Sequence, residues 1–550
     1  MPPTVKKIGE DSFRGNTSLE TVHIPSSMVS IGNYAFYGCN NIKAVYTYTV
    51  EPTKISENTF SCFETATLYV PTFSFYNYYW DENGWKRFLN LENFDEPYEY
   101  FYVNNDYILN DNTGYIEGAD GENPDADINS GAGFIVEGEQ GDDEEAKQQL
   151  GDVNVNHDGQ GNGGSIIGDN NLYIDSLHIK IDVKGGRWYF FAFPYDIPFK
   201  NIKMENGSEY VFRYYDGEER ATNGNGGWKD INENHLKAAR GYIFQCSAND
   251  VLVLSIGNLK MKKEDKYNEL VAHVSENLDD ASWNFTGNPY ISYYDIADMD
   301  YSAPVTIWDG SKYVAIRPGD DDYHFAPYEA FFVQKPETQS CIGFEGDKQM
   351  TGNQSKDKQE KQAALRRAKI AAGDTDKRRQ LVNIVLSNGE QDDRTRIVFN
   401  ESQTHNYESS CDAAKFETAG VPQIYTIDDE NVHYAINERP AGNGIVKVGY
   451  SVTVEGTYTI ETQRMDVNVY ILDKKEQYLH SLDEGAYTFT TDAGKFEDRF
   501  EILLEAAATS IENVNSNNDG ENTVYDLMGR RVKRTGKGIY IVDGNKIRVK

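Results

Sequence analysis

Residues 8–25, IGEDSFRGNTSLETVHIP, decide the fold of the N-terminal region because they return 23 residues later as IGNYAFYGCNNIKAVYTY over residues 31–48. The matching positions are Ile8/Ile31, Gly9/Gly32, Phe13/Phe36, Gly15/Gly38, Leu19/Ile42 and Val22/Val45. A third, less regular copy follows at an offset of 24, with Ile55 and Phe60. A period of about 20–29 residues with apolar anchors at fixed offsets predicts a solenoid, in which each turn supplies one short strand and stacks on the next turn.

The repeated pattern Ile-Gly-x3-Phe-x-Gly-x3-Leu-x2-Val-x-Ile-Pro resembles the leucine-rich repeats of BspA-like surface proteins of Bacteroidetes, over about residues 5–71. The resemblance implies a core position for Cys39 and a place at the cell surface for the protein. Ile8 and Phe13 lack the polar capping turn that a solenoid end needs. We therefore expect further repeats and a signal peptide to precede this chain, in which no apolar leader of about 7–15 residues is visible.

The composition favours a globular protein of several domains. At roughly 150 residues per domain, 550 residues predict about three to four domains. The 88 Asp and Glu residues outnumber the 53 Lys and Arg residues, and a net charge of -35 repels a phosphate backbone. The longest apolar runs have about six residues, against the roughly 20 that a membrane-spanning helix needs. We therefore predict neither a nucleic-acid partner nor a membrane span.

A second duplication lies in the middle of the chain, where three aromatic motifs recur in the same order at offsets that drift from 95 to 89. The paired motifs are Trp188-x5-Pro194-Tyr195 with Trp283-x5-Pro289-Tyr290, Tyr215-Asp216-Gly217 with Trp308-Asp309-Gly310, and Gly241–Gln245 with Ala330–Gln334. Aromatic stretches separated by Asp-Gly and Asn-Gly turns are typical of β-strands. We predict two related β modules here.

Changes in composition set the remaining boundaries. Twelve acidic residues between Glu117 and Asp152 face one lysine, so we expect an extended linker or solvated loop around residues 138–168. The predicted fold class is mainly β and multidomain, with these segments: 1–94, a leucine-rich repeat solenoid truncated at its N-terminus; 95–171, irregular strands and the acidic linker; 172–265 and 266–352, the two β modules; 353–379, a helical charged linker; 380–507, a β-sandwich; and 508–550, a linker and a small C-terminal β tail.

The last 27 residues form a basic tail on an acidic chain. Eight Lys or Arg and two Asp give residues 524–550 a charge of about +6. The motifs Tyr-Asp-x-x-Gly-Arg-x-Val and Gly-Ile-Tyr-Ile-Val in this tail resemble the C-terminal sorting domain of type IX secretion substrates in Bacteroidetes. The resemblance implies that the tail engages a secretion machinery.

The sequence points to no catalytic residues and to no cofactor. None of the nine histidines falls in a zinc-binding spacing, and no GxSxG, P-loop or GxGxxG motif is present. With 88 carboxylates, close acidic pairs occur by chance and cannot nominate a glycosidase acid and base. The cluster from Pro318 to His324 has three carboxylates and an imidazole, but a solvated turn explains it better than a metal site does.

One segment has the spacing of a calcium loop. Asp152, Asn154, Asn156 and Asp158 place an oxygen-bearing side chain at every second residue, and Gly159 follows as a turn glycine. We name these four residues as a candidate calcium site. The match is incomplete, because Ser165 stands where the loop needs a bidentate Glu. The alternative is a plain turn rich in Asn, Asp and Gly.

Aromatic residues provide the candidate ligand surface. Tyr and Trp rings on a β surface can bind the flat C–H face of a sugar, although paired aromatics also stabilise strands directly. We expect Trp188 and Trp283 to lie in the core. The candidates for an exposed ligand surface are Tyr76, Tyr78, Tyr79, Trp80 and Trp85.

The favoured function is that of a non-catalytic, adhesin-like bacterial protein that is secreted or held at the outer cell surface. Its expected partners are surface proteins or glycans of a host or of bacteria, bound through the repeats and the β modules. The alternative is a secreted carbohydrate-active enzyme or its carbohydrate-binding appendage, and a third hypothesis is a structural spacer. Two carboxylates about 5–10 Å apart in an aromatic cleft would favour the enzyme.

Overall fold

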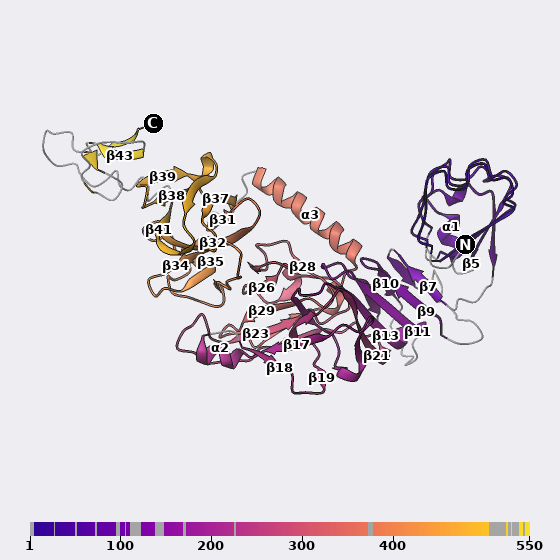
Figure 1. Ribbon diagram of the computed structural model, residues 1–550, viewed down its shortest axis with the longest axis horizontal. Coiled ribbons are helices and arrows are strands. Elements are labelled where there is room, and N and C mark those ends of the chain that lie inside the picture. Colours follow the sequence, from indigo (N-terminus) through magenta and orange to yellow (C-terminus); the bar gives the residue numbers. More distant parts are fainter. Residues whose placement is uncertain are drawn as a thin grey trace.

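A computed structural model of the chain shows a mostly β protein, with 47% strand and 9% helix, which confirms the predicted fold class (Figure 1). The first strands and the C-terminal strands lie at opposite ends of an elongated molecule. The structure describes residues 5–26, 28–49, 52–71, 74–94, 100–104, 106–109, 123–137, 148–168, 172–224, 227–371, 378–504, 524–525, 530, 538–542 and 545–549.

The N-terminal region is a solenoid with a four-stranded parallel sheet, as its repeats predict. The strands are β2 (Thr21–Ile24), β4 (Ala44–Thr47), β5 (Thr67–Pro71) and β6 (Asn90–Phe94), and β1 (Lys7–Ile8) pairs with β3 (Ser30–Ile31). Val22, Val45 and Leu68 lie side by side in register and are buried, because each repeat returns the chain to the same place. Cys39 is a buried free thiol of this core.

A second stack of parallel strands follows where the sequence predicted irregular strands and an acidic linker, in residues 95–171. One sheet contains β7 (Tyr100–Val103), β9 (Asp125–Ile128), β11 (Gln148–His157) and β13 (Leu172–Val183), and the other contains β8 (Tyr107–Leu109), β10 (Gly133–Val136) and β12 (Ser165–Gly168). The expected loop is wrong for residues 148–168, because Leu150, Val153 and Val155 bury themselves between the sheets. The rest of the expected linker, residues 138–147, lies outside the described residues.

The two β modules, module 1 (residues 172–265) and module 2 (residues 266–352), have sheets with the same strand order. In module 1 the order is β14 (Tyr189–Ala192), β20 (Gly241–Cys246), β17 (Tyr210–Tyr215), β18 (Trp228–Asp230), and in module 2 it is β23 (Trp283–Gly287), β29 (Ala330–Gln334), β26 (Val305–Trp308), β27 (Tyr313–Ile316).

The smaller strands of the modules repeat as well. The pair β15 (Ile197–Pro198) and β19 (His235–Leu236) of module 1 corresponds to the pair β24 (Tyr294–Asp295) and β28 (His324–Phe325) of module 2. In module 1, β21 (Asp250–Lys260) pairs with β13 and with β16 (Ile202–Met204). The corresponding strand of module 2 is β30 (Cys341–Phe344), which pairs with β22 (Lys266–Glu269) and β25 (Met299–Asp300).

The two modules pack with their sheets related by an approximate two-fold axis. Phe191 of module 1 bridges to Glu329 of module 2, and the corresponding Thr286 of module 2 bridges back to Arg240 of module 1. Aromatic rings fill the space between the sheets: the Phe285 ring lies 4.9 Å from that of Phe190 and 4.3 Å from that of Phe332. Trp283 is buried in this core as predicted, and Trp188 packs against it partly buried.

The C-terminal region is one continuous sheet, which corrects the predicted two-sheet sandwich. Its strands are β31 (Arg379–Ser387), β32 (Asp392–Asn400), β33 (Ala413–Ala414), β34 (Gln423–Ile427), β35 (His433–Arg439), β36 (Ile445–Val452), β37 (Gly456–Met465), β38 (Val469–Asp473), β39 (Tyr478–Ser481), β40 (Tyr487–Thr491) and β41 (Gly494–Leu504). The sheet curls into a barrel-like shape, so that Val382 on β31 and Phe500 on β41 share one buried core.

Helices are few. The helix α3 (Gly352–Ala371) connects module 2 to the C-terminal sheet, and α1 (Phe75–Tyr79) and α2 (Gly217–Asn223) are short. In the tail, β42 (Val524–Tyr525), β43 (Gly538–Val542) and β44 (Asn545–Val549) form a small antiparallel sheet. Among the helices in the described ranges, none is long and apolar enough to cross a membrane.

Candidate binding sites

The outward face of the N-terminal sheet carries a ladder of stacked rings. His23, Tyr46 and Tyr69 occupy the same register position on β2, β4 and β5, because the repeats place them 23 residues apart. The His23 and Tyr46 ring centroids lie 4.7 Å apart with planes 4° from parallel, and those of Tyr46 and Tyr69 lie 4.6 Å apart at 10°. Tyr48 and Phe94 extend the ladder, with ring centroids 5.3 Å apart. We call these five residues the aromatic face.

The stacking decides what this surface offers to a ligand. In a stack, each inner ring covers the π face of its neighbours, so Tyr46 presents its edge and hydroxyl outward. The Glu92 carboxylate beside Tyr69 raises the pKa of the Tyr69 hydroxyl by its charge. The repeat alignment contained the signal for this face, because His23, Tyr46 and Tyr69 share one repeat position.

The predicted ligand surface around α1 is split by the structure. Tyr76, Tyr79 and Trp80 are exposed, by 67%, 51% and 73%, and so are available to a ligand. Tyr78 and Trp85 are not, because both lie in the solenoid core. The Tyr78 hydroxyl donates to the Thr49 carbonyl, and the Trp85 indole N–H donates to the Thr53 carbonyl. These two residues hold the end of the solenoid together, and their assignment to a ligand surface is corrected.

The backbone of the predicted calcium site differs from that of a calcium loop. Asp152, Asn154 and Asn156 lie on β11, where alternate side chains point to one face of an extended strand and do not wrap around an ion as those of a calcium loop do. Asp158 caps the following turn by accepting from the backbone N–H groups of Gln160 and Asn162. Within the described ranges, no three His, Cys, Asp or Glu side chains are grouped as metal ligands. The loop interpretation of these residues is therefore wrong.

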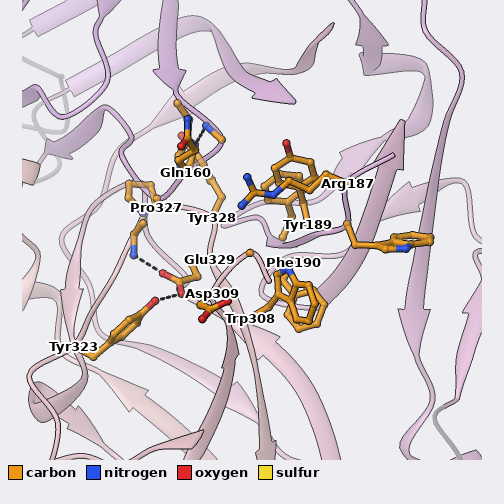
Figure 2. A pocket seen from close by; sticks show the side chains of 17 residues that line it. Gln160, Arg187, Tyr189, Phe190, Trp308, Asp309, Tyr323, Pro327, Tyr328 and Glu329 are labelled. Atoms are coloured by element: carbon orange, nitrogen blue, oxygen red, sulfur yellow. Dashed lines mark hydrogen bonds between the residues drawn. The ribbon is translucent and has the colours of Figure 1, made fainter. Parts of the chain in front are cut away.

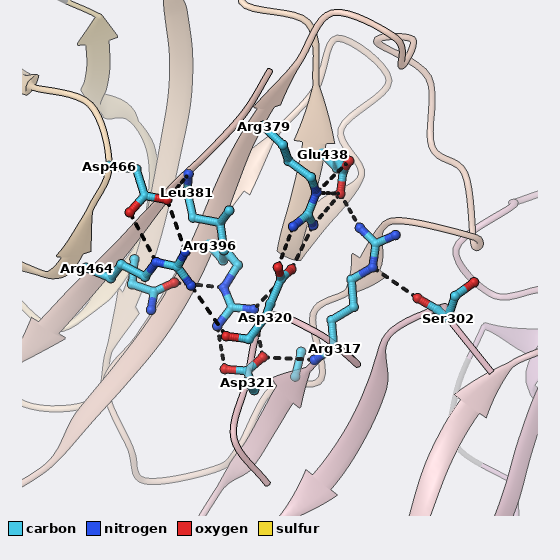
Figure 3. A network of polar contacts seen from close by, with 12 residues as sticks. Ser302, Arg317, Asp320, Asp321, Arg379, Leu381, Arg396, Glu438, Arg464 and Asp466 are labelled. Atoms are coloured by element: carbon cyan, nitrogen blue, oxygen red, sulfur yellow. Dashed lines mark hydrogen bonds and ion pairs between the residues drawn. The ribbon is translucent and has the colours of Figure 1, made fainter. Parts of the chain in front are cut away.

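The acidic residues of the cluster from Pro318 to His324 bind arginines of the C-terminal sheet (Figure 3). Asp321 accepts from both terminal nitrogens of Arg396, at 2.7 and 2.6 Å. Asp320 makes a two-point contact with Arg379, which also binds Glu438 on β35. The Arg396 side chain is 1% exposed, and its hydrogen bonds overcome burial to lower the pKa of Asp321. This arginine network holds module 2 against the C-terminal sheet.

His324 belongs to a different contact, at the start of α3. Its Nδ1 lies 2.8 Å from the Ser355 hydroxyl, and its Nε2 lies 3.4 Å from a carboxylate oxygen of Asp295. The three residue types match a Ser-His-Asp triad, but a nucleophile must also reach a substrate. Ser355 is 3% exposed, and the side chains of His324 and Asp295 are buried. The trio packs α3 onto module 2.

Two clefts lie between the modules, one on each side of the approximate two-fold axis. Cleft A has a volume of about 280 Å³ and lies between Asp309 and Tyr328 of module 2 and residues 187–191 of module 1 (Figure 2). Cleft B has a volume of about 520 Å³ and lies between the corresponding Asp216 and Ala239 of module 1 and residues 283–286 of module 2. The duplication thus gives two related clefts, and no single sequence motif predicted either of them.

Cleft A contains two carboxylates, but both support turns. Asp309 uses one oxygen to accept from the Ser311 side chain and from the backbone N–H groups of Ser311 and Lys312. Glu329 accepts from the Tyr323 hydroxyl and from the Ala326 N–H, and burial raises the pKa of Glu329 to about 7. One Asp309 oxygen and both Glu329 oxygens are thus committed to holding the turns around cleft A.

Comparison with known families gives two matches. Residues 1–104 match the model described as BspA type leucine rich repeat region (6 copies). The N-terminal solenoid is a BspA-type leucine-rich repeat region. Residues 304–504 match a domain of unknown function (DUF8693). No curated protein and no solved structure matches the chain.

The two matched regions contain different sites. The aromatic face lies within the BspA-type region, whose family is generally non-enzymatic. The DUF8693 match covers Asp320 and Asp321 together with Arg379 and Arg396, so it spans both sides of the arginine network. This range also fits the structure, in which the second half of module 2 and the C-terminal sheet are joined by buried ion pairs.

Proposed function

We propose that this protein is a non-catalytic, adhesin-like binding protein of the bacterial cell exterior, and that the aromatic face is its surface for a protein ligand. The aromatic face is the observation that carries the proposal. BspA-type leucine-rich repeat domains are typically found in surface adhesin-like proteins. Their repeats give a regular, rigid surface on which side chains of one position form a continuous row.

The chemistry of the aromatic face fits a protein better than a glycan. A sugar ring binds by laying its C–H face on an open π face, and Tyr46, the middle ring of this stack, has neighbours on both sides. Ring edges and hydroxyls suit a polypeptide, and Tyr is enriched in protein interfaces because it gives a large contact area at low entropic cost. The His23 and Tyr48 rings lie in the same patch, with Nδ1 and hydroxyl 3.2 Å apart.

The test is binding of the full chain to a panel of purified host extracellular-matrix proteins, collagen, laminin and fibronectin, by surface plasmon resonance. We expect at least one to bind, and the double variant Tyr46→Ala/Tyr69→Ala to weaken that binding by about tenfold or more. Trp80→Ala serves as the control, because Trp80 is the most exposed aromatic of the α1 surface. Loss of binding in the control with an unaffected double variant would move the site to α1.

Export through a secretion machinery of Bacteroidetes is the second part of the proposal. Its support is the resemblance of residues 524–550 to a type IX sorting domain, and the described part of the tail forms a small separate sheet. Most of the Tyr-Asp motif lies outside the described residues. Expression with a leader peptide in a bacterium that has the type IX system should place the chain outside the cell, and deletion of residues 524–550 should retain it inside.

A further inference from the structure

The short helix α1 presents three aromatic side chains to solvent on one of its faces. Tyr76 is followed by Tyr79 at i+3 and by Trp80 at i+4, and side chains three and four residues apart lie on the same side of a helix. They are 67%, 51% and 73% exposed, whereas Tyr78, on the opposite side, is 1% exposed. We call Tyr76, Tyr79 and Trp80 the α1 platform. Neighbouring exposed aromatics of this kind mark an interaction site.

The backbone beneath the α1 platform is fixed by residues that are not part of the platform. The buried Tyr78 hydroxyl donates to the Thr49 carbonyl at 2.9 Å. Just after the helix, the Asp81 carboxylate accepts from the backbone N–H groups of Asn83 and Trp85, both at 2.8 Å. The exposed rings are thus held in place by core contacts, so a ligand that binds them does not have to order the backbone first.

The rings of the α1 platform keep open π faces. Trp80 meets Tyr79 edge to face, with ring centroids 4.8 Å apart and planes at 86°, and Tyr76 meets Phe75 at 5.7 Å and 86°. A perpendicular contact covers at most one face of a ring. Among the described residues, no ring stacks in parallel on Trp80 or Tyr76. In the aromatic face, by contrast, Tyr46 has a parallel ring on each side.

The size and the charge of the α1 platform select its ligand. An aromatic side chain has about 150–250 Å² of surface, so three partly exposed ones offer roughly 300–500 Å². A stable protein interface buries about 800 Å² on each partner, which is more than the platform provides. The helix carries no acidic side chain in its first turn and no basic one in its last, and the net charge of -35 repels anionic ligands and a second copy of the chain.

We propose that the α1 platform binds a neutral polysaccharide, whose sugar rings lay their C–H faces on the open faces of Trp80 and Tyr76. An exposed surface of this kind does not enclose a single sugar, so a chain of sugars that contacts several rings at once is the ligand that fits it. The site is separate from the aromatic face, shares no residue with it and binds a different class of ligand. Failure of either proposal therefore leaves the other standing.

The experiment is affinity electrophoresis of the full chain in native gels that contain laminarin, xyloglucan, galactomannan or glycogen, with polygalacturonate as the acidic comparison. We expect at least one neutral polysaccharide to retard the wild type. Trp80→Ala and Tyr76→Ala should each raise the Kd for it by about tenfold or more, and Trp80→Phe, which keeps a ring, should raise it less. The matched control is Tyr267→Ala, because Tyr267 is 64% exposed but lies on β22, and this variant should bind as the wild type does.

Three results would overturn the proposal. The first is that no neutral polysaccharide retards the wild type, or that polygalacturonate retards it more. The second is that Tyr267→Ala weakens binding as much as Trp80→Ala does, which would place the binding outside the α1 platform. The third is binding to phosphatidylcholine vesicles that Trp80→Ala abolishes, which would make the platform a lipid-binding surface. Thermal unfolding checks the fold of each variant, and Trp80→Phe carries the test if Trp80→Ala is destabilised.

Discussion

Modules 1 and 2 have the same strand order and pack face to face, yet their corresponding loops do different things. The loop after β27 carries Asp320 and Asp321, which bind arginines of the C-terminal sheet. The corresponding loop after β18 carries Glu233, whose side chain is 38% exposed and pairs with Lys237 and Arg240 of its own module. Duplication preserved the framework, and the loops of the two copies acquired separate roles.

The clefts differ in the same way. Where cleft B has the small Ala239 in a left-handed turn, cleft A has Tyr328, and where cleft B has a paired Arg240, cleft A has the buried Glu329. Both copies place a residue other than glycine at a left-handed φ, so the strain is shared, and cleft A is costlier to fold only because Glu329 is a titratable group taken out of water. This cost falls on one copy only, so the two clefts are not equivalent although the framework around them is the same.

Removal of the Asp321 carboxylate should give the largest difference between the modules. Asp321→Ala leaves the buried Arg396 without its two-point partner, and breaking a buried ion pair costs about 3–5 kcal/mol. The corresponding Glu233→Ala should cost less than about 1 kcal/mol, because that pair is exposed to solvent. Urea unfolding followed by tryptophan fluorescence measures both. Equal losses in the two variants would show that the arginine network does not stabilise the interface with the C-terminal sheet.

Glu329 should make stability depend on pH, whereas Arg240 should not. Burial raises the pKa of Glu329 from 4.5 to about 7, so between these values the folded protein holds a proton that the unfolded chain has released. Stability must therefore fall as pH rises from about 4.5 to 7, by at most about 3 kcal/mol.

The Glu329→Gln variant should remove the Glu329 part of this fall, since glutamine does not titrate, whereas Asp412, whose pKa burial raises to about 8, keeps its own part. Thermal unfolding of the wild type and the variant at about pH 5, 6 and 7 measures how steeply the stability of each falls with pH. Arg240→Gln is the matched control, because it changes the corresponding residue of module 1 without removing a carboxyl group. A Glu329→Gln curve parallel to that of the wild type would mean that Glu329 is ionised throughout this range.

The sequence predicted the features that repeat at a fixed spacing. The 23-residue offset identifies the solenoid because every copy must place Val22, Val45 and Leu68 at the same position in one core. The aromatic motifs of the two modules were visible for the same reason. For residues 100–168 only irregular strands and a linker were predicted. Their regular stacking was missed because the strands recur at spacings that vary, from 25 between Phe101 and Ala126 to 27 between Ala126 and Val153.

The candidate sites were harder to predict because sequence order does not show burial. Tyr78 and Tyr79 are neighbours in one aromatic run, but one is 1% exposed and the other 51%, since the short α1 turns them to opposite sides. Asp152, Asn154 and Asn156 have the spacing of a calcium loop and equally that of one face of a strand. Val153, which lies between two of these residues, is buried, as alternate residues of a strand are, and so the segment is a strand.

The smallest predicted effect concerns the left-handed turn that both modules share. Ala239 has a φ of 58°, where a glycine is free of the Cβ clash, so Ala239→Gly should raise stability by up to about 1 kcal/mol. The neighbouring Ala238 is outside the left-handed region, and Ala238→Gly should lower stability by about 0.4–1 kcal/mol, because glycine adds entropy to the unfolded chain. Thermal unfolding measures the change in stability of each variant. A gain for Ala239→Gly together with a loss for Ala238→Gly would establish that the left-handed turn itself destabilises module 1. If Ala239→Gly is destabilising, the left-handed turn is unstrained in module 1.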